Sequence, residues 1–267
     1  MKLPAMAGCG RVVGLALLLM VWSAAVAGAA ALKNLVKYQE LSEAEIAEVF
    51  YDTVFGSEDP TVGKLRSGTV RKYTKPIKYF VQSDGKARIT PLEMMLESLT
   101  FIMPAVPVSA ADKLVNADIR IFLVADNDAM ARKAKEIWGR NISREQLRFM
   151  KGLPCTVFLD YYGSSSRIRR STILFALTNS QNHTECAFEE FIQALGPIND
   201  SRASTKTLMN DASFFAQIPL LDLYIANMLY DSAIKPGMSK KQVRKVFPGV
   251  LARTRQKLEW VTQTIRE

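Results

Sequence analysis

The chain has 267 residues, of which 48% are hydrophobic and 23% are charged, a globular composition that excludes a disordered protein. Its formal net charge is +9, and its single histidine, His183, excludes a histidine-rich metal centre. The sequence contains no glycine-rich phosphate loop and no dinucleotide fingerprint, so we expect no cofactor.

The first thirty residues have the pattern of a secretory signal peptide. Lys2 and Arg11 precede an apolar run, VVGLALLLMVW, and small residues follow it. Cleavage is expected near Ala29 to Ala31 and would leave a mature chain with a net charge of +7. The run is short for a bilayer span, which needs ~20 residues, so we favour cleavage over an uncleaved membrane anchor. We therefore expect a periplasmic or secreted protein with no nucleic-acid partner.

Helices and strands alternate in the pattern from residue 41 onward. Ser42 and Glu45 fit a capping box at the start of a helix over 41–55. Thr90 and Pro91 fit the cap and the first helical position of a helix that ends before Pro104. The other elements expected in this half are strands at 77–82 and 117–125 and helices at 127–140 and 143–150. No repeat or low-complexity linker interrupts the chain, so we expect one domain over residues 40–238.

Two further strands are expected at 155–162 and 168–177, and the loop GSSS between them favours antiparallel neighbours. Because Cys9 leaves with the signal peptide, the mature chain keeps Cys155 and Cys186. In an oxidising compartment such a pair is most simply a disulfide, closing a loop of about thirty residues and contributing about 3–4 kcal/mol. The alternative is two separate buried thiols. A metal site is less favoured, because soft ligands nearby are too few.

A helix beginning at Cys186 carries the stretch CAFEEFIQALGPIND, which runs to Asp200, and Gly196-Pro197 is its expected end. Its apolar residues recur at i, i+3, i+4 and i+7: Phe188, Phe191, Ile192 and Leu195. Its other face holds Cys186, Glu189, Glu190 and Gln193. This polar face is either a solvated surface, which we favour on pattern alone, or a cleft-facing surface that presents carboxylates to a ligand. The cysteine favours partial burial.

The C-terminal residues 239–267 are expected to form a basic helical tail, preceded by a helix over 219–230. Ser239 caps a helix that runs to Phe247, and Pro248 separates it from a second helix over 250–265. Against Glu259 and Glu267, the segment holds eight cations: Lys240, Lys241, Arg244, Lys245, Arg253, Arg255, Lys257 and Arg266. We favour a solvated helix face. The alternative is a segment that binds an anionic membrane surface or an acidic partner, with Trp260 at the interface.

Two stretches taken together resemble a known family. They are CAFEEFIQALGPIND and, at residues 221–239, LDLYIANMLYDSAIKPGMS. Their order and spacing resemble the domain of unknown function 2927 family (DUF2927), a group of exported bacterial proteins and lipoproteins with no established activity. The resemblance covers most of the mature chain.

That family is in turn similar to the zincin metalloproteases, in which the two histidines of H-E-x-x-H bind zinc and the glutamate is the general base. Glu189, Glu190 and Gln193 stand at the positions of the first histidine, the glutamate and the second histidine. Downstream, Asp222 and Leu229-Tyr230 resemble the helix that closes matrixin-like domains. The resemblance implies an α+β, zincin-like single domain, a mixed β-sheet packed by helices, with a helical C-terminal tail.

The departures from the zincin motif argue against catalysis. Glutamine is a neutral, weak zinc ligand, and His183 precedes Glu189 by six residues, so we expect no zinc. A hard-cation site at Glu189, Gln193 and Asp200 is a minor alternative. His183 as the base of a catalytic triad is less favoured than His183 as a surface residue.

We expect an exported envelope protein that binds a protein, peptide or glycan in the remnant cleft without catalysis. One alternative is a metal-dependent hydrolase that uses Glu190 as general base. Another is a membrane-surface protein that acts through the basic tail.

Overall fold

The computed structural model describes residues 30–56, 68–85, 88–139, 142–178 and 183–267. The predicted signal peptide therefore lies outside the described residues, except for Ala30. In the described part of the chain, no helix has the length and apolar character needed to cross a membrane.

A five-stranded mixed sheet forms the centre of the fold, in the order β3-β2-β4-β6-β5. Its strands are β2 (Ile77–Ser83), β3 (Val108–Ala110), β4 (Ile119–Val124), β5 (Cys155–Tyr161) and β6 (Ile168–Ala176). β3, β2, β4 and β6 pair in parallel, and β5 is the antiparallel edge strand beside β6. The antiparallel pair expected around the GSSS loop is confirmed. β3 was not expected from the sequence, because three residues carry too little pattern to predict a strand.

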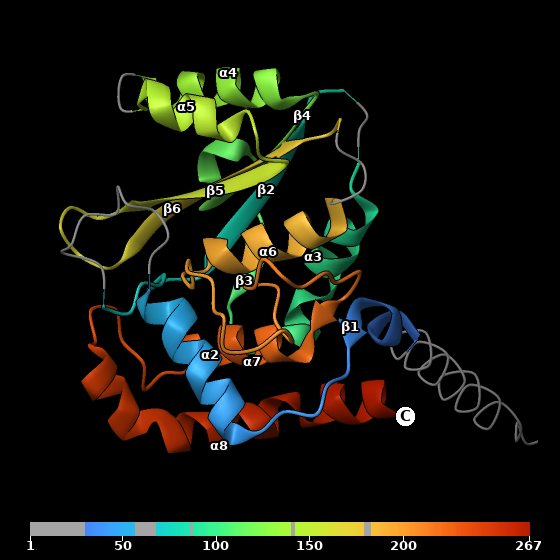
Figure 1. Ribbon diagram of the computed structural model, residues 1–267, viewed down its shortest axis with the longest axis vertical. Helices are drawn as coiled ribbons and strands as arrows, with labels where there is room; N and C mark the ends of the chain where they lie inside the picture. The colour runs from blue at the N-terminus through green and yellow to red at the C-terminus, as the bar shows by residue number, and fades with distance from the viewer. Residues whose placement is uncertain (1–29, 57–67, 86–87, 140–141, 179–182) are drawn as a thin grey trace, which may run out of the picture.

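Helices cover both faces of the sheet (Figure 1). One face, with Ile121 and Ile173, packs on α3 (Thr90–Ile102) and α6 (His183–Ala194) in the main core. The other, with Phe122 and Leu174, packs under α4 (Asn127–Trp138) and α5 (Arg144–Met150) in a second, smaller core. Residues on both faces of the central strands are thus buried, as is usual for parallel strands covered by helices.

A further layer of helices lies beyond α3 and α6 (Figure 1). It contains α2 (Glu43–Phe55), α7 (Leu220–Leu229) and α8 (Lys240–Arg266). α7 is central to this layer, since each of its 10 residues is buried. Just before α7, β7 (Ile218–Pro219) pairs in parallel with β1 (Val36–Lys37), which brings the start of the described chain to the start of α7.

Pro248 lies inside one continuous helix, α8, so the prediction that it separates two helices is wrong. A mid-helix proline removes a backbone hydrogen bond and costs about 3 kcal/mol or more. The apolar stripe continues across it, because Phe247, Val250 and Leu251 are all buried in the main core. Burying one such side chain contributes about 1.5–3 kcal/mol, so tertiary packing outweighs the local penalty. The basic C-terminal segment is therefore docked along the core.

The caps of three helices were predicted from sequence, and the structure agrees in part. Ser239 and Gln242 form a complete capping box at α8. At α3 the helix starts one residue earlier than expected, with Ile89 at the cap position and no side-chain cap. At α2, Ser42 Oγ accepts from the amide of Glu45, but the Glu45 carboxylate turns to other partners.

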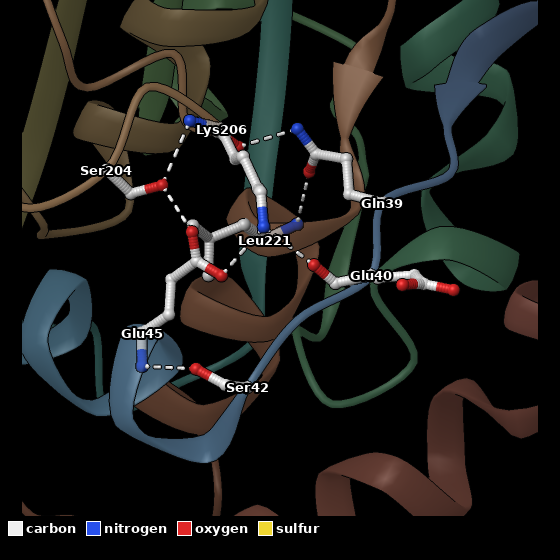
Figure 2. A network of polar contacts seen from close by, with 7 residues as sticks. All are labelled: Gln39, Glu40, Ser42, Glu45, Ser204, Lys206 and Leu221. Carbon is white, nitrogen blue, oxygen red and sulfur yellow. Dashed lines mark hydrogen bonds and ion pairs between the residues drawn. The ribbon is translucent and has the colours of Figure 1, made fainter.

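Those partners come from a segment far along the chain (Figure 2). Glu45 accepts from Ser204 Oγ at 2.6 Å and from Lys206 Nζ at 3.0 Å. Lys206 Nζ also donates to the carbonyl of Glu40, and Gln39 Nε2 donates to the carbonyl of Lys206. Burial alone would raise the pKa of Glu45, but the bonds from Ser204 and Lys206 hold it below its ordinary value. This network fastens the start of α2 to the segment before α7.

Candidate functional site

Helix α6, which carries the remnant motif, lies in the main core. Phe188, Phe191 and Ile192 are buried, as the sequence predicts. Glu190 is only 7% exposed and Gln193 only 9%, however, while Glu189 is half-buried. The interpretation of this face as a solvated surface is therefore wrong. α6 packs against β5, β6 and α3, which encloses the helix on most sides and leaves little of the motif in contact with solvent.

The structure brings two of the three motif side chains together. Gln193 Nε2 donates to Glu189 Oε1 at 3.3 Å, a contact between successive turns of one helix. Across the described residues, no three histidine, cysteine, aspartate or glutamate side chains gather in a group that could hold a metal ion. The side chain of His183 lies outside the description.

The disulfide joins the start of β5 to the first turns of α6. Cys155 and Cys186 are bonded, with their Cα atoms 6.0 Å apart, and both side chains are buried. The predicted pairing is confirmed. It fixes the remnant-motif helix against the antiparallel edge strand of the sheet.

Two consecutive cations, Arg71 and Lys72, are buried where helices end. Arg71 Nη2 donates to the carbonyls of Val54 (3.0 Å) and Gly56 (2.6 Å), at the C-terminal end of α2. Lys72 Nζ donates to the carbonyls of Leu229 (2.7 Å) and Ile234 (3.1 Å), at and beyond the end of α7. Helix C-terminal ends leave carbonyls unsatisfied and carry partial negative charge, so a cation there is favourable.

The next residue, Tyr73, reaches the end of the third helix, α6. Its hydroxyl lies 2.7 Å from Ser171 Oγ, and Ser171 Oγ donates to the carbonyl of Ala194. Tyr230 completes this end by donating its hydroxyl to the carbonyl of Leu195 at 2.9 Å. The segment 71–73 therefore ties together the C-terminal ends of α2, α7 and α6.

A cleft of about 310 Å³ opens beside this junction. We call it the lysine cleft, because three lysines line it. Its other lining residues include two tyrosines and three prolines: Tyr73, Tyr230, Pro76, Pro107 and Pro236, beside Lys72, Lys75 and Lys235. Lys75 and Lys235 are exposed at its rim, whereas Lys72 is 7% exposed at its base. Its walls come from the segment before β2, the segment before β3 and the turn after α7.

The electrostatics of the lysine cleft centre on Lys72. The pKa of Lys72 is lowered to about 8, first by burial and then by the Lys235 cation, while Asp231 opposes both effects. Its Nζ lies 4.8 Å from the ring centroid of Tyr230, a cation–π contact. Lys75 pairs with Asp118 at 2.7 Å, and this hydrogen bond raises the pKa of Lys75. Burial also raises the pKa of Tyr230, which keeps its phenol neutral.

At neutral pH the cleft therefore presents ammonium groups to whatever enters it. Ammonium groups donate hydrogen bonds and attract negative charge, and they bind carboxylates or phosphates as point charges. The prolines supply rigid apolar walls with no amide donors.

Sequence reasoning missed this junction. It treats Val70-Arg71-Lys72-Tyr73 as a lead into Pro76, since arginine and lysine are almost never fully buried unless paired. The partners of both cations are backbone carbonyls at helix ends, which no local pattern in the sequence connects to residues 71 and 72. Asp222, singled out from the resemblance, is a buried structural residue that accepts from Thr207 Oγ1 and from the amide of Leu208.

Comparison with known families gives one match. Residues 43–249 match the family described as Protein of unknown function (DUF2927). The chain belongs to this family. The matched range begins at the first residue of α2 and ends inside α8, so the DUF2927 domain contains the disulfide, the remnant motif and the lysine cleft. No curated protein and no solved structure matches the chain.

Proposed function

We propose that this DUF2927 protein is an exported binding domain that holds an anionic group of an envelope partner, peptide or glycan, in the lysine cleft. The observation that carries the proposal is the convergence of Lys72, Lys75 and Lys235 on one cavity. Lys72 already donates to two backbone carbonyls, and Lys75 pairs with Asp118. Lys235 is therefore the cation best placed to contact a ligand.

Export is supported by two features of the chain. The first is the predicted signal peptide at residues 1–30. The second is the disulfide between Cys155 and Cys186, since such bonds persist in oxidising compartments. We propose a periplasmic or secreted location on this basis.

We also propose that the core is zincin-like and non-catalytic. The mixed sheet, its antiparallel edge strand β5 and the motif-bearing helix that follows β6 support the resemblance. The motif Glu189, Glu190 and Gln193 lacks both histidines, and the near-complete burial of Glu190 favours a role in packing over one as a general base. In this proposal α6 is a structural element, and binding occurs in the lysine cleft, whose Tyr230 donates to the carbonyl of Leu195 just after that helix.

Binding of two acidic probes tests the proposal. An acetylated Asp-Gly-Glu amide and a trigalacturonate would be titrated calorimetrically into the protein, with an Asn-Gly-Gln amide as the neutral control. We expect one acidic probe to bind, and Lys235→Gln to weaken it at least tenfold. Lys113→Gln removes an exposed lysine outside the cleft and is the matched control. Equal weakening in both variants, or binding of neither probe, would contradict the proposal.

One observation favours a second candidate, a membrane-surface role. Trp260 on α8 and Phe101 on α3 are 49% and 59% exposed, with ring centroids 6.1 Å apart. Exposed aromatics beside cations suit a membrane interface. Two α8 cations are engaged in ion pairs within the molecule, however: Arg253 pairs with Asp231 and Arg255 with Glu43. Sedimentation with liposomes across a salt series tests this role, and no preference for anionic lipid would rule it out.

A further inference from the structure

A second cavity, of about 430 Å³, lies between the sheet and α4, on the opposite face of the sheet from α6. Its floor comes from β2, β4, β5 and β6, and α4 forms one wall. It shares no lining residue with the lysine cleft. We call it the arginine pocket, because Arg120, Arg169 and Arg170 line it together with Lys133.

Two of these four cations have acidic partners. Lys133 Nζ lies 2.8 Å from Glu136, and Arg169 Nη2 lies 3.3 Å from Asp160. Both acids also line the pocket. Four cations and two acids leave the pocket with a formal surplus of two positive charges, and two of its arginines make no ion pair.

Arg120 and Arg170 are those two, and they lie on neighbouring strands. Arg120 on β4 is in register with Thr172 on β6, two residues from Arg170, so both arginines project from the same face of the sheet. Within the described residues, neither makes an ion pair, and the Nε of each is buried without a hydrogen-bond partner. A buried donor with no acceptor and a nearby like charge are both unfavourable.

The pKa of Arg120 is lowered by this arrangement. Burial lowers the pKa of Arg120, the positive charge of Arg170 lowers it further, and Asp160 opposes them. Both guanidinium groups nevertheless remain charged in proteins. The pair therefore carries two positive charges that an anion would neutralise.

Part of the pocket wall is apolar, although Lys133 and Glu136 of α4 also line it. Trp138 and Ile137 on α4 line it with Leu114, and the Trp138 ring packs on Phe158 with centroids 4.4 Å apart. This contact fixes the indole beside the arginines. A ligand with an anionic end and a ring-shaped body would meet both the charged floor and the apolar wall, and the cavity volume is typical of small-molecule sites.

We propose that the arginine pocket binds a small phosphate monoester with a ring-shaped body. A monoester dianion matches the surplus of two positive charges in the pocket, and guanidinium groups such as those of Arg120 and Arg170 form forked hydrogen bonds with phosphate oxygens. The ring lies against Trp138. This site is independent of the lysine cleft, so either proposal can fail without the other.

Calorimetric titration of phenyl phosphate into the purified protein tests the site. The comparison probes are inorganic phosphate, which lacks the ring, benzoate, which lacks the second negative charge, and phenol, which lacks the anionic group. We expect one molecule of phenyl phosphate to bind per chain, at least tenfold tighter than any comparison probe. Arg120→Gln and Arg170→Gln should each weaken binding at least tenfold. Arg132 is an exposed arginine of α4 that lies outside the pocket, so Arg132→Gln should change binding less than twofold.

Thermal melting distinguishes a variant that has lost binding from one that has lost its fold. Without ligand, Arg120→Gln should raise the melting temperature, because it removes one of two neighbouring like charges. Phenyl phosphate should raise the melting temperature of the original protein and leave that of Arg120→Gln unchanged. Absence of binding by phenyl phosphate at millimolar concentration, or equal weakening by Arg132→Gln, would overturn the proposal. Equal affinity for inorganic phosphate would overturn the assignment of a ring-bearing ligand.

Discussion

Gly196 lies directly against the carbonyl oxygen of Arg71. A Cβ atom at position 196 would sit 2.1 Å from that oxygen and 3.2 Å from Leu229 Cδ2. The backbone of Gly196 also has a φ of +134°, a conformation that residues other than glycine rarely adopt. The end of α6 can therefore approach the segment 71–73 only because residue 196 has no side chain.

Gly196→Ala should destabilise the protein by about 3 kcal/mol or more, since it combines backbone strain with overlap on a backbone atom that cannot move aside. Gly237→Ala is the matched control: its φ is +83° and no atom lies within 4 Å of the added Cβ, so it isolates the backbone cost. Urea unfolding measures both. A loss at position 196 no larger than that at position 237 would show that the close approach contributes nothing.

The sequence predicts those parts of the fold that local periodicity determines. The apolar stripe of α6, the strands β2, β4, β5 and β6 and the cap at Ser239 follow from residue spacing. The disulfide follows from counting cysteines in a chain predicted to be exported. The burial of Glu190 and the continuity of α8 through Pro248 were not predictable, because packing between distant segments decides both.

The candidate sites were beyond the reach of sequence pattern for a related reason. Lys72 meets Leu229 and Ile234 across more than 150 residues of chain, and these partners are carbonyls, which every residue has. Arg120 and Arg170 meet because β4 and β6 pair in parallel, a register that depends on the whole sheet. Their side chains read in sequence as ordinary charges at strand positions.

The pH dependence of stability should reveal Lys72. Its pKa is about 8 in the folded protein, whereas the ordinary pKa of a lysine is 10.5. Between these values the unfolded chain binds more protons at Lys72 than the folded chain does, so raising the pH stabilises the fold, by up to about 1.4 kcal/mol per pH unit. Relative to Lys72→Met, the original protein should gain stability from pH 7.5 to 9.5 in urea titrations.

The Lys235 cation provides an internal check on that interpretation. The Lys235 charge is, after burial, the second cause of the lowered pKa of Lys72. Lys235→Gln removes that charge, so the pH-dependent rise in stability should move to higher pH. A difference between the original protein and Lys72→Met that stays constant over this range would contradict the lowered pKa.

Asp222 should give the opposite slope at lower pH. Burial raises its pKa from 3.8 to about 7, so the folded protein keeps the proton that the unfolded chain loses. Its contribution to stability is fully present below pH 4 and is lost as the pH rises to about 7. Asp222→Asn mimics the protonated acid, since its amide can donate to Thr207 and its oxygen can accept from the Leu208 amide. The variant should lack this loss, and Asp211→Asn, at an exposed position, should retain it.

Reduction of the Cys155–Cys186 disulfide should cost about 3–4 kcal/mol, because the bond closes a loop across a sequence separation of 31 residues. Urea unfolding with and without dithiothreitol measures the difference. The Cys155→Ala, Cys186→Ala double variant controls for the reagent and should not respond to it. Intact mass spectrometry should find the oxidised chain two hydrogens lighter, and an unchanged midpoint on reduction would show that the bond does not stabilise the fold.

Glu190 separates the binding and hydrolase hypotheses. If α6 is structural, Glu190→Gln should keep the affinity of the lysine cleft for its acidic probe within twofold and change stability by about 1–2 kcal/mol, the cost of altering one buried polar group. A general base would behave differently, because its loss typically lowers a rate by 10²–10⁴-fold. Hydrolysis of fluorogenic peptides should therefore be absent from both the original protein and the variant.

Native mass spectrometry of protein purified without chelator measures the metal content. Stoichiometric zinc, together with peptide hydrolysis that disappears in Glu190→Gln, would show that the motif is catalytic and that its missing ligands come from elsewhere in the chain.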